Sequence, residues 1–487
     1  MRLSISAGLV ATSLAVTGCA LGGGKDNAEE VVVGDRISVL SLEQDLIIDR
    51  ALAAQPAQLP PVFINDAWPQ PGGYSHHAMQ HLSLEPNFRV LWKSDAGAGS
   101  NDRRHISASP VVAWGSVFTL DAKAVASAFD AKTGRRLWRR DFSLKGESAD
   151  AGYGGGVAVS GGNVIVTTGF GDVIAVDAES GEEIWKRSLG VPVRTPPTAA
   201  GGQIYVTTVE NHFYAMDDRT GTTLWSYRGI SETASLVSDA TPAVMGDLVV
   251  APFSSGELVA FQAQNGRELW SDFLSRTGRV TPLAGINAIS GRPVINRGRV
   301  VAVSHNGRLV SIDLRSGRRF WSHNLTSIET PWVAGDHVFL VTTNSQVVAL
   351  NWDDGRIRWV SDLPSFKNEK KRKGPIRWAG PVLAGNQLIL VSSEGRMVFL
   401  SPESGETIGD RKVPDGSFIA PVVADGVMYL LTSGGQLVAF GGGTGVSTTE
   451  AKATRTIDVE VVEDISLETS EDEKGRQALI DIDLFGR

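Results

Sequence analysis

The sequence predicts an all-β protein with the architecture of an eight-bladed β-propeller, in which each blade is a four-stranded antiparallel sheet. Three observations predict it. A turn motif that ends in tryptophan recurs along residues 88–440, a β-rich hairpin pattern precedes each copy, and the 54 glycines suit many tight turns. The repeat averages about 44 residues, which is the length expected of a four-stranded propeller blade.

The turn motif is clearest in residues 173–185, which read "VIAVDAESGEEIW". Gly181 provides the positive φ of a tight turn, and Asp177 can accept hydrogen bonds from the turn amides. Trp185 recurs at the same place in successive copies, so we interpret it as an indole packed between adjacent blades. The repeated positions are Gly134, Gly181, Gly221, Gly266, Gly317 and Gly355, with Asp130, Asp177, Asp217 and Asp313, and with Trp138, Trp185, Trp225, Trp270, Trp321 and Trp359.

The two ends of the periodic region predict how the ring closes. The eighth copy stops at Phe440 and lacks the turn and the tryptophan, whereas "FRVLW", which ends at Trp92, stands alone at the start. The N-terminal strand near Trp92 is therefore expected to pair with the last blade and close the ring. Closure of this kind removes the exposed sheet edge that an open array would present.

The N-terminus predicts export and lipidation. Residues 1–18 have a positive Arg2 and an apolar stretch typical of a signal peptide, and Cys19, the lone cysteine, follows at a site that resembles a bacterial lipobox. Acyl chains on Cys19 would hold the protein at a bilayer. Ala20, rather than an aspartate, implies the outer membrane by the sorting rule of enterobacterial lipoproteins.

These features divide the chain into four parts. We expect a signal peptide at residues 1–18, a lipidated tether at 19–61, the propeller at 62–440 and an acidic, disordered tail at 441–487. Within the propeller part, residues 62–88 are expected to be an irregular lead-in to the first blade.

Composition and motifs exclude several functions. The net charge of −8 provides no basic surface for nucleic acid, and the chain has neither a P-loop nor a G-x-S-x-G elbow. A cluster of His76, His77 and His81 is not expected to bind a metal, because few other ligand types accompany it. The basic run from Lys367 to Lys373 is expected in a loop between blades, as a solvated insertion or as a site for an acidic partner or anionic lipid.

The repeated A-x-D-x-x-[ST]-G-x-x-x-W turn resembles that of the quinoprotein-like propeller family. This family includes pyrroloquinoline-quinone dehydrogenases and the BamB lipoproteins of outer-membrane protein assembly, and a lipobox joined to a bare propeller is similar to the latter. The resemblance implies a non-catalytic scaffold without a cofactor, lipid-anchored at the outer membrane and facing the periplasm. Its implied partners are the POTRA domains of BamA, other subunits of the β-barrel assembly (BAM) complex and nascent outer-membrane proteins.

Two other functions stay open. The first is a periplasmic quinone-dependent dehydrogenase, although such enzymes often use a disulfide between neighbouring cysteines, and the chain has only Cys19. The second is a sensor propeller that binds a ligand such as a glycan.

Two long inter-blade loops carry the candidate partner-binding residues. The loops that follow Trp225 and Trp270 contain apolar residues expected to be exposed, among them Ile230 and Ile289. The resemblance to BamB proteins implies a contact with BamA through Leu236, although Val237 stands where enterobacterial relatives have an arginine. The candidate residues for binding BamA are Leu236, Val237, Arg276, Arg279 and Ile286.

Overall fold

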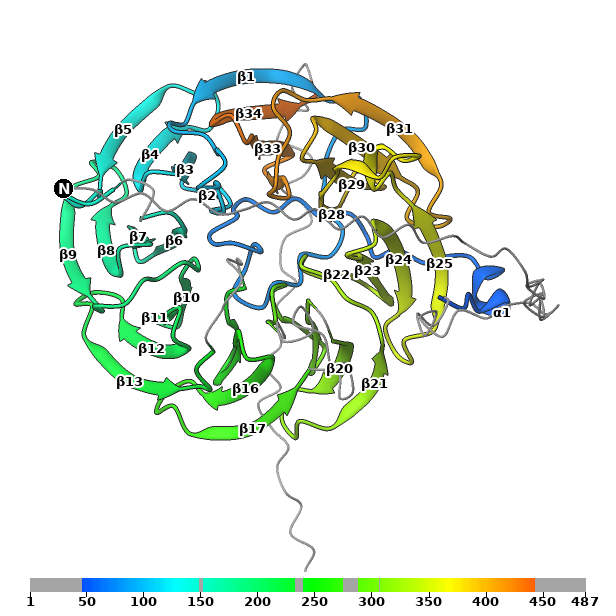
Figure 1. The fold of residues 1–487 in the computed structure, drawn as a ribbon, viewed down its shortest axis with the longest axis horizontal. Helices are drawn as coiled ribbons and strands as arrows, with labels where there is room; N and C mark the ends of the chain where they lie inside the picture. The colour runs from blue at the N-terminus through cyan, green and yellow to red at the C-terminus, as the bar shows by residue number, and fades with distance from the viewer. Residues whose placement is uncertain (1–45, 149–151, 233–239, 275–287, 306, 443–487) are drawn as a thin grey trace, which may run out of the picture. The chain divides into compact units, whose positions relative to one another are not determined.

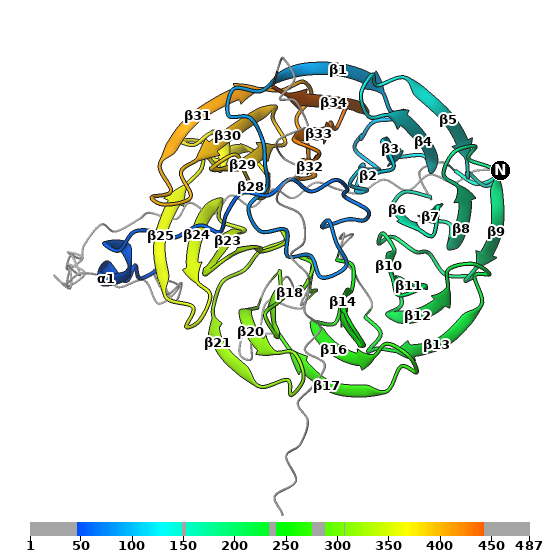
Figure 2. The ribbon, with the colours of Figure 1, turned by 180° about the vertical axis from the view of Figure 1, so that it is seen from behind.

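The computed structural model describes residues 46–148, 152–232, 240–274, 288–305 and 307–442. These residues form eight four-stranded antiparallel sheets arranged in a ring, which Figures 1 and 2 show from its two sides. The prediction of an all-β, eight-bladed propeller is confirmed.

Blades 1 to 7 each consist of four consecutive strands that run outward from the central channel. Blade 1 contains β2 (Val111–Ala113), β3 (Ser116–Leu120), β4 (Val125–Asp130) and β5 (Arg136–Asp141), and blade 2 contains β6 (Gly155–Ser160), β7 (Asn163–Thr168), β8 (Asp172–Asp177) and β9 (Glu183–Ser188). Blade 3 contains β10 (Thr198–Ala200), β11 (Gln203–Thr207), β12 (His212–Asp217) and β13 (Thr223–Arg228), and blade 4 contains β14 (Ala243–Met245), β15 (Leu248–Pro252), β16 (Glu257–Gln262) and β17 (Glu268–Phe273).

The remaining blades repeat this arrangement, except that blade 8 takes its outermost strand, β1, from the start of the ring. Blade 5 contains β18 (Val294–Asn296), β19 (Arg299–Val303), β20 (Leu309–Asp313) and β21 (Arg319–His323), and blade 6 contains β22 (Trp332–Ala334), β23 (His337–Val341), β24 (Gln346–Asn351) and β25 (Ile357–Asp362). Blade 7 contains β28 (Trp378–Ala384), β29 (Gln387–Ser392), β30 (Arg396–Leu400) and β31 (Thr407–Lys412), and blade 8 contains β32 (Val422–Ala424), β33 (Val427–Leu431), β34 (Gln436–Gly441) and β1 (Arg89–Asp95).

Two small elements lie outside the eight sheets. The helix α1 (Arg50–Ala53) packs beside β25, and β26 (Phe366–Asn368) with β27 (Lys373–Pro375) forms a hairpin between blades 6 and 7. No helix within the described ranges is long and apolar enough to cross a membrane.

The core lies between the blades. The three inner strands of a blade are buried on both faces because the neighbouring sheets pack against them, so their sequences are nearly continuous apolar runs. The outermost strands differ. In β5 and β9 only the tryptophan is buried, while the residues around it face solvent.

The tryptophan of the turn motif seals the seam between adjacent blades. Trp185 Nε1 donates a hydrogen bond to the carbonyl oxygen of Asp218 in blade 3 at 3.1 Å. Gly221 of the same blade lies on the indole at a φ of +66°, and a Cβ there would come within 2.5 Å of the ring. The same hydrogen bond joins Trp92 to Ala131, Trp138 to Ala178, Trp225 to Ala263, Trp270 to Leu314, Trp321 to Trp352 and Trp359 to Pro402.

The seam between blades 7 and 8 is built differently, because Gly409 stands where the other blades have tryptophan. Phe88 fills this seam. Its ring centroid lies 5.7 Å from that of Phe399 in blade 7 and 5.9 Å from that of Phe440 in blade 8. The strand that follows Phe88 is β1, which pairs antiparallel with β34 and places Trp92 opposite Ala439. The first and last strands of the ring therefore share one sheet.

Residues 62–84, here called the channel segment, cross the centre of the ring, where they are drawn in blue in Figures 1 and 2. The sequence predicts them only as an irregular lead-in, but they form hydrogen bonds with every blade. The pairs, in blade order, are Val112 with Trp68, Val159 with Pro69, Ala199 with Gln70, Val244 with Ser75, Ile295 with His76, Gly335 with Gln80, Gly385 with Leu82, and Asp425 with Asn65.

Deleting residues 46–84 is expected to destabilise the ring, because each blade loses an anchor point that contributes about 1 kcal/mol. Buried apolar side chains of the segment, such as Met79 and Leu82, are lost with it. The midpoint of chemical unfolding, measured by tryptophan fluorescence, should fall clearly. A deletion of residues 20–45 leaves the segment intact and serves as the control. Equal midpoints for the two deletions would contradict the assigned role.

Candidate functional site

The connections between strands lie on two opposite faces of the ring, because successive strands of a blade are antiparallel. One face carries the hairpin turns between the first and second strands, together with the turn motifs; we call it the turn face. The channel segment lies toward this face, since it bonds to Gly335, Gly385 and Asp425 in those hairpin turns. The opposite face carries the connections from each outermost strand to the next blade; we call it the loop face.

The central channel contains a cavity of about 910 Å³. The channel segment contributes Trp68, Gly72 and His77 to its lining, and residues of the loop face, such as Arg103 and Arg377, contribute to its other end. The rings of Trp68 and Trp332 are stacked with centroids 6.4 Å apart. The cavity is therefore bounded by the protein's own chain on the side of the turn face.

Buried polar groups fix the wall of this cavity. Arg292 is buried, and its Nη1 donates to Thr330 Oγ1 at 3.2 Å. The amide of Gly380 donates to a carboxylate oxygen of Glu329 at 3.2 Å. These hydrogen bonds join blades 5, 6 and 7 around the cavity and hold the side chains of its wall in fixed positions.

The histidine cluster serves the channel segment. His77 Nδ1 donates to the carbonyl oxygen of Pro293 at 2.7 Å, and Nδ1 of His81 donates to that of Pro60 at 2.9 Å. Burial, together with the nearby guanidinium of Arg292, lowers the pKa of His77 to about 3. His76 is half-buried, and burial lowers its pKa as well. The ring nitrogens of His77 and His81 are thus engaged in anchoring the segment to the ring.

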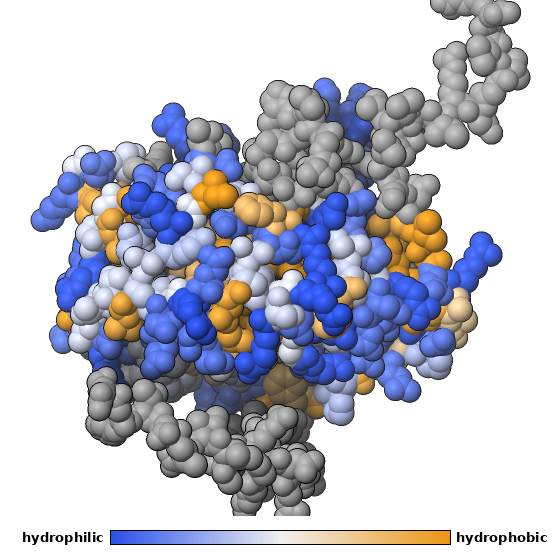
Figure 3. Space-filling view, turned by 90° about the horizontal axis from the view of Figure 1, so that it is seen from below, coloured by the Kyte–Doolittle hydropathy of each residue, from blue (hydrophilic) through white to orange (hydrophobic). Residues whose placement is uncertain are grey.

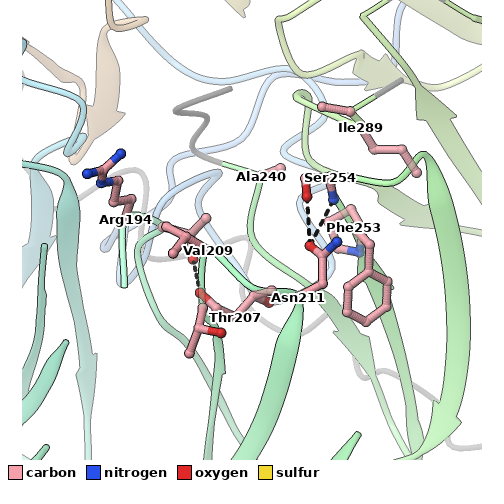
Figure 4. A pocket seen from close by; sticks show the side chains of 12 residues that line it. Arg194, Thr207, Val209, Asn211, Ala240, Phe253, Ser254 and Ile289 are labelled. Carbon is pink, nitrogen blue, oxygen red and sulfur yellow. Dashed lines mark hydrogen bonds between the residues drawn. The ribbon is translucent and has the colours of Figure 1, made fainter. Parts of the chain in front are cut away.

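The five residues proposed to bind BamA, namely Leu236, Val237, Arg276, Arg279 and Ile286, lie outside the described residues. The ends of their two loops meet at a small pocket of about 40 Å³ between blades 3 and 4. Figure 4 shows Asn211 at its centre, where Oδ1 accepts hydrogen bonds from the amide and hydroxyl of Ser254 at 3.1 and 2.9 Å. Ala240 and Ile289, which flank the two loops, line the same pocket.

Of the two apolar residues predicted to be exposed beside these loops, one is exposed and the other is buried. Ile230 is exposed as expected, and its carbonyl oxygen accepts a hydrogen bond from Asn211 Nδ2. The expectation that Ile289 is exposed is wrong, because its side chain packs into the core between blades 4 and 5. The base of the second loop therefore belongs to the scaffold.

The basic run from Lys367 to Lys373 lies between blades 6 and 7, as expected, and forms a β-hairpin. Glu369 accepts hydrogen bonds from the amides of Ser365 and Phe366 at 2.8 and 3.0 Å and so fixes the hairpin's base. The guanidinium of Arg372 lies over the Phe366 ring at 5.5 Å. The strand that follows ends near Arg377 at the edge of the channel cavity, so the hairpin stands on the loop face.

Sequence reasoning missed the channel segment. Its contacts reach eight different blades, so no local periodicity marks them. One available signal was the placement of apolar Met79, Leu82 and Leu84 between polar residues, since all three side chains are buried.

Comparisons with known proteins agree with this architecture. The family model for outer membrane protein assembly factor BamB matches residues 121–361 and 364–456. The factor of that name from Yersinia pestis is 26% identical over 355 residues, or 72% of this chain and 88% of that protein. Its counterpart from Burkholderia pseudomallei is 28% identical over 72% of this chain and 87% of that protein.

Two solved structures are similar in fold. BamB from Moraxella catarrhalis superposes with a TM-score of 0.61 at 18% identity, covering 73% of this chain and 100% of that chain. Quinohemoprotein alcohol dehydrogenase from Comamonas testosteroni also has a TM-score of 0.61, at 14% identity, covering 82% of this chain and 84% of that chain.

The ring and its turn motif define the protein as a propeller of the quinoprotein-like class. Within that class, the match over most of its length shows that the chain belongs to the family of the outer membrane protein assembly factor BamB.

The channel cavity does not fit a quinone with a calcium ion. Calcium takes six to eight oxygen ligands, with carboxylates prominent among them. The carboxylates that line the cavity are Glu329, which holds the Gly380 amide, and Glu394, which is paired with Lys367. Across the described ranges, no group of three or more His, Cys, Asp or Glu side chains could hold a metal ion.

Acid is expected to destabilise the protein through His77. The pKa of His77 is lowered to about 3 in the folded state. Below about pH 6.5, His77 therefore binds a proton in the unfolded chain but stays neutral in the folded chain until the pH approaches 3. The stability is therefore present above pH 6.5 and is lost as the pH falls toward 3. Between pH 7 and pH 5 this single group accounts for about 2 kcal/mol of the free energy of unfolding.

The variant His77→Asn keeps a donor for Pro293 and tolerates the backbone φ of +62° at this position. Urea unfolding at pH 7 and pH 5 should show a smaller loss of stability in the variant than in the natural chain. The same pH dependence in both proteins would show that His77 does not titrate as argued.

Proposed function

We propose that this chain is a non-catalytic lipoprotein scaffold of the outer-membrane β-barrel assembly complex, which assists the folding and insertion of outer-membrane proteins. The observation that carries the proposal is its membership of the BamB family. The protein would be held at the outer membrane by acyl chains on Cys19 and would face the periplasm. Residues 19–61 would form the lipidated tether to the ring.

The proposed partner on the loop face is BamA, through its POTRA domains. Connections on a rigid ring are the part of a propeller that can vary from blade to blade without disturbing the seams. The described residues next to these two loops, Ala240 and Ile289, line the pocket around Asn211 between blades 3 and 4. A rigid base of this kind lowers the entropy lost when the loops bind.

Reversing charge on these loops is expected to release BamA. The double variant Arg276→Glu and Arg279→Glu should reduce the amount of BamA that co-purifies from solubilised membranes by at least tenfold. The matched control is Arg219→Glu with Arg315→Glu, which makes the same charge change at exposed positions of the turn face. If BamA is retained equally by both variants, the loop face is not its binding site. If BamA never co-purifies with the natural chain, the proposed function itself fails.

The outer rim is the proposed site for nascent outer-membrane proteins. Each outermost strand lies at the edge of its sheet and has a β-bulge beside the position of the motif tryptophan, and the bulged residue is exposed and apolar in seven blades. In Figure 3, apolar side chains form separate orange patches on this side wall among hydrophilic residues. The bulged residues are Leu91, Leu137, Ile184, Leu224, Leu269, Phe320 and Ile408.

Blade 6 shows that such an edge accepts an extended segment. Ile48 pairs in parallel with Ile357 of β25, and the amide of Asp49 donates to the Ile357 carbonyl oxygen at 2.9 Å. The bulged residue of this blade is Arg358, which is buried under the chain's own residues and donates to the Gln55 carbonyl oxygen. A single bridge thus forms at the backbone edge beside the bulge, and we propose that the other seven rims offer the same backbone to a nascent strand.

Photo-crosslinking tests this site. Benzoylphenylalanine at position 184, on the rim of blade 2, is expected to crosslink to newly exported outer-membrane proteins during a short pulse. Position 179, in the exposed turn of the same blade, serves as the control. Equal labelling at both positions, or none at position 184, would rule out strand addition at the rim.

A further inference from the structure

The eight hairpin turns between first and second strands can be compared with one another, because they occupy the same place in each blade. The first turn residue has a φ between +44° and +60° in every blade, a conformation that favours glycine. Glycine occupies it in five blades. In the order of the blades the residues are Trp114, Gly161, Gly201, Gly246, Arg297, Gly335, Gly385 and Asp425.

Two of the three exceptions have an explanation within the ring. Arg297 forms an ion pair with Asp336 at 2.9 Å, and its guanidinium lies over the Trp352 ring at 5.5 Å. Asp425 is of a type that tolerates this conformation, and its amide donates to the carbonyl oxygen of Asn65 at 2.7 Å. Both residues therefore suit their turns.

Trp114 has no such explanation. Its side chain is 59% exposed, and within the described part of the chain its indole makes no hydrogen bond or ring contact. The turn thus combines an unfavourable backbone conformation with a large exposed apolar surface, and neither contributes to the stability of the ring. Arg297 has a similar backbone conformation, but of the eight equivalent residues only Trp114 combines it with a large exposed apolar side chain, which points to a role outside the fold.

The surroundings of Trp114 form an exposed patch on the turn face. Trp68 forms an isolated antiparallel bridge with Val112, so Asp66, which precedes Trp68, lies on the same side of that bridge as Trp114, which follows Val112. Asp66 is exposed, and Ile64, two residues before it, is 51% exposed.

Blade 8 completes this patch. Asn65 bonds to the amide of Asp425, and its Nδ2 donates to the Val423 carbonyl oxygen at 2.6 Å, so the segment crosses from blade 8 to blade 1 at this point. Asp425 is exposed in its turn. Ile64 and Asp66 therefore flank the residue that bonds to blade 8, and Trp114 and Asp425 occupy equivalent turns of the neighbouring blades 1 and 8; we call these four residues the Trp114 patch.

We propose that the Trp114 patch is a second protein-binding surface, whose partner offers an apolar pocket for the indole and a rim of lysine or arginine side chains for Asp66 and Asp425. Exposed tryptophans anchor protein interfaces because a large flat ring enters a pocket with little loss of conformational entropy. The two carboxylates favour a basic protein surface over an anionic lipid surface, which would repel them. The patch lies on the face opposite the loops proposed for BamA, so its test does not depend on that contact.

The first experiment separates binding from folding. Trp114→Asn replaces the indole with a residue that suits the left-handed conformation, so the unfolding midpoint of the full chain should stay equal or rise. Gly246→Asn is the matched control, since it places the same side chain in the equivalent turn of blade 4, where a Cβ meets no atom within 4 Å. A lower midpoint for Trp114→Asn alone would show a structural role and overturn the proposal.

The second experiment identifies the partner in cells. Benzoylphenylalanine at position 114 of the full lipoprotein should give a protein adduct that is absent when the probe stands at position 246. The adduct should map to an apolar pocket bordered by lysine or arginine, and Asp66→Lys with Asp425→Lys should reduce its yield at least fivefold. No adduct, an adduct with lipid alone, an adduct with a second copy of this chain, or an adduct unaffected by the charge reversal would each overturn the proposal.

Discussion

The seam between blades is the interaction on which the rest of the structure depends. An indole from one blade lies under a glycine of the next, and its single N–H group donates to a backbone carbonyl of that blade, as in the contact of Trp185 with Asp218 and Gly221. One contact therefore provides apolar burial, a satisfied donor and a fixed spacing between sheets. Because the contact repeats around the ring, an error in spacing at one seam would be carried to all the others.

The N-terminal part of the chain completes what the repeats leave open. Phe88 fills the seam that lacks tryptophan, and β1 supplies the missing strand of blade 8. The channel segment then bonds to each blade at its inner strand or at the turn that follows it, where backbone groups would otherwise face the channel. The ring is thus held at its rim by the seams and at its centre by a segment that belongs to no blade.

Function is expected where the repeats differ. The seams and inner strands are nearly alike from blade to blade, and they leave no room for change. The differences are the long loops after blades 3 and 4, the basic hairpin of β26 and β27, the covered rim of blade 6 and the tryptophan in the first turn of blade 1. The hairpin, the rim of blade 6 and the tryptophan face solvent or a neighbouring segment of the chain.

The sequence by itself determined the number of blades, the turn motif and the pairing of tryptophan with a turn, because these are local patterns that repeat with a constant period. It also indicated that the strand at Trp92 complements the last blade. Only the tertiary structure decided the path of residues 62–84, the burial of Ile289 and the exposure of Trp114. These depend on contacts between residues far apart in the chain, and such contacts leave no period in the sequence. The sequence of a turn does not show whether its side chain is exposed or buried, because that depends on the neighbouring blades.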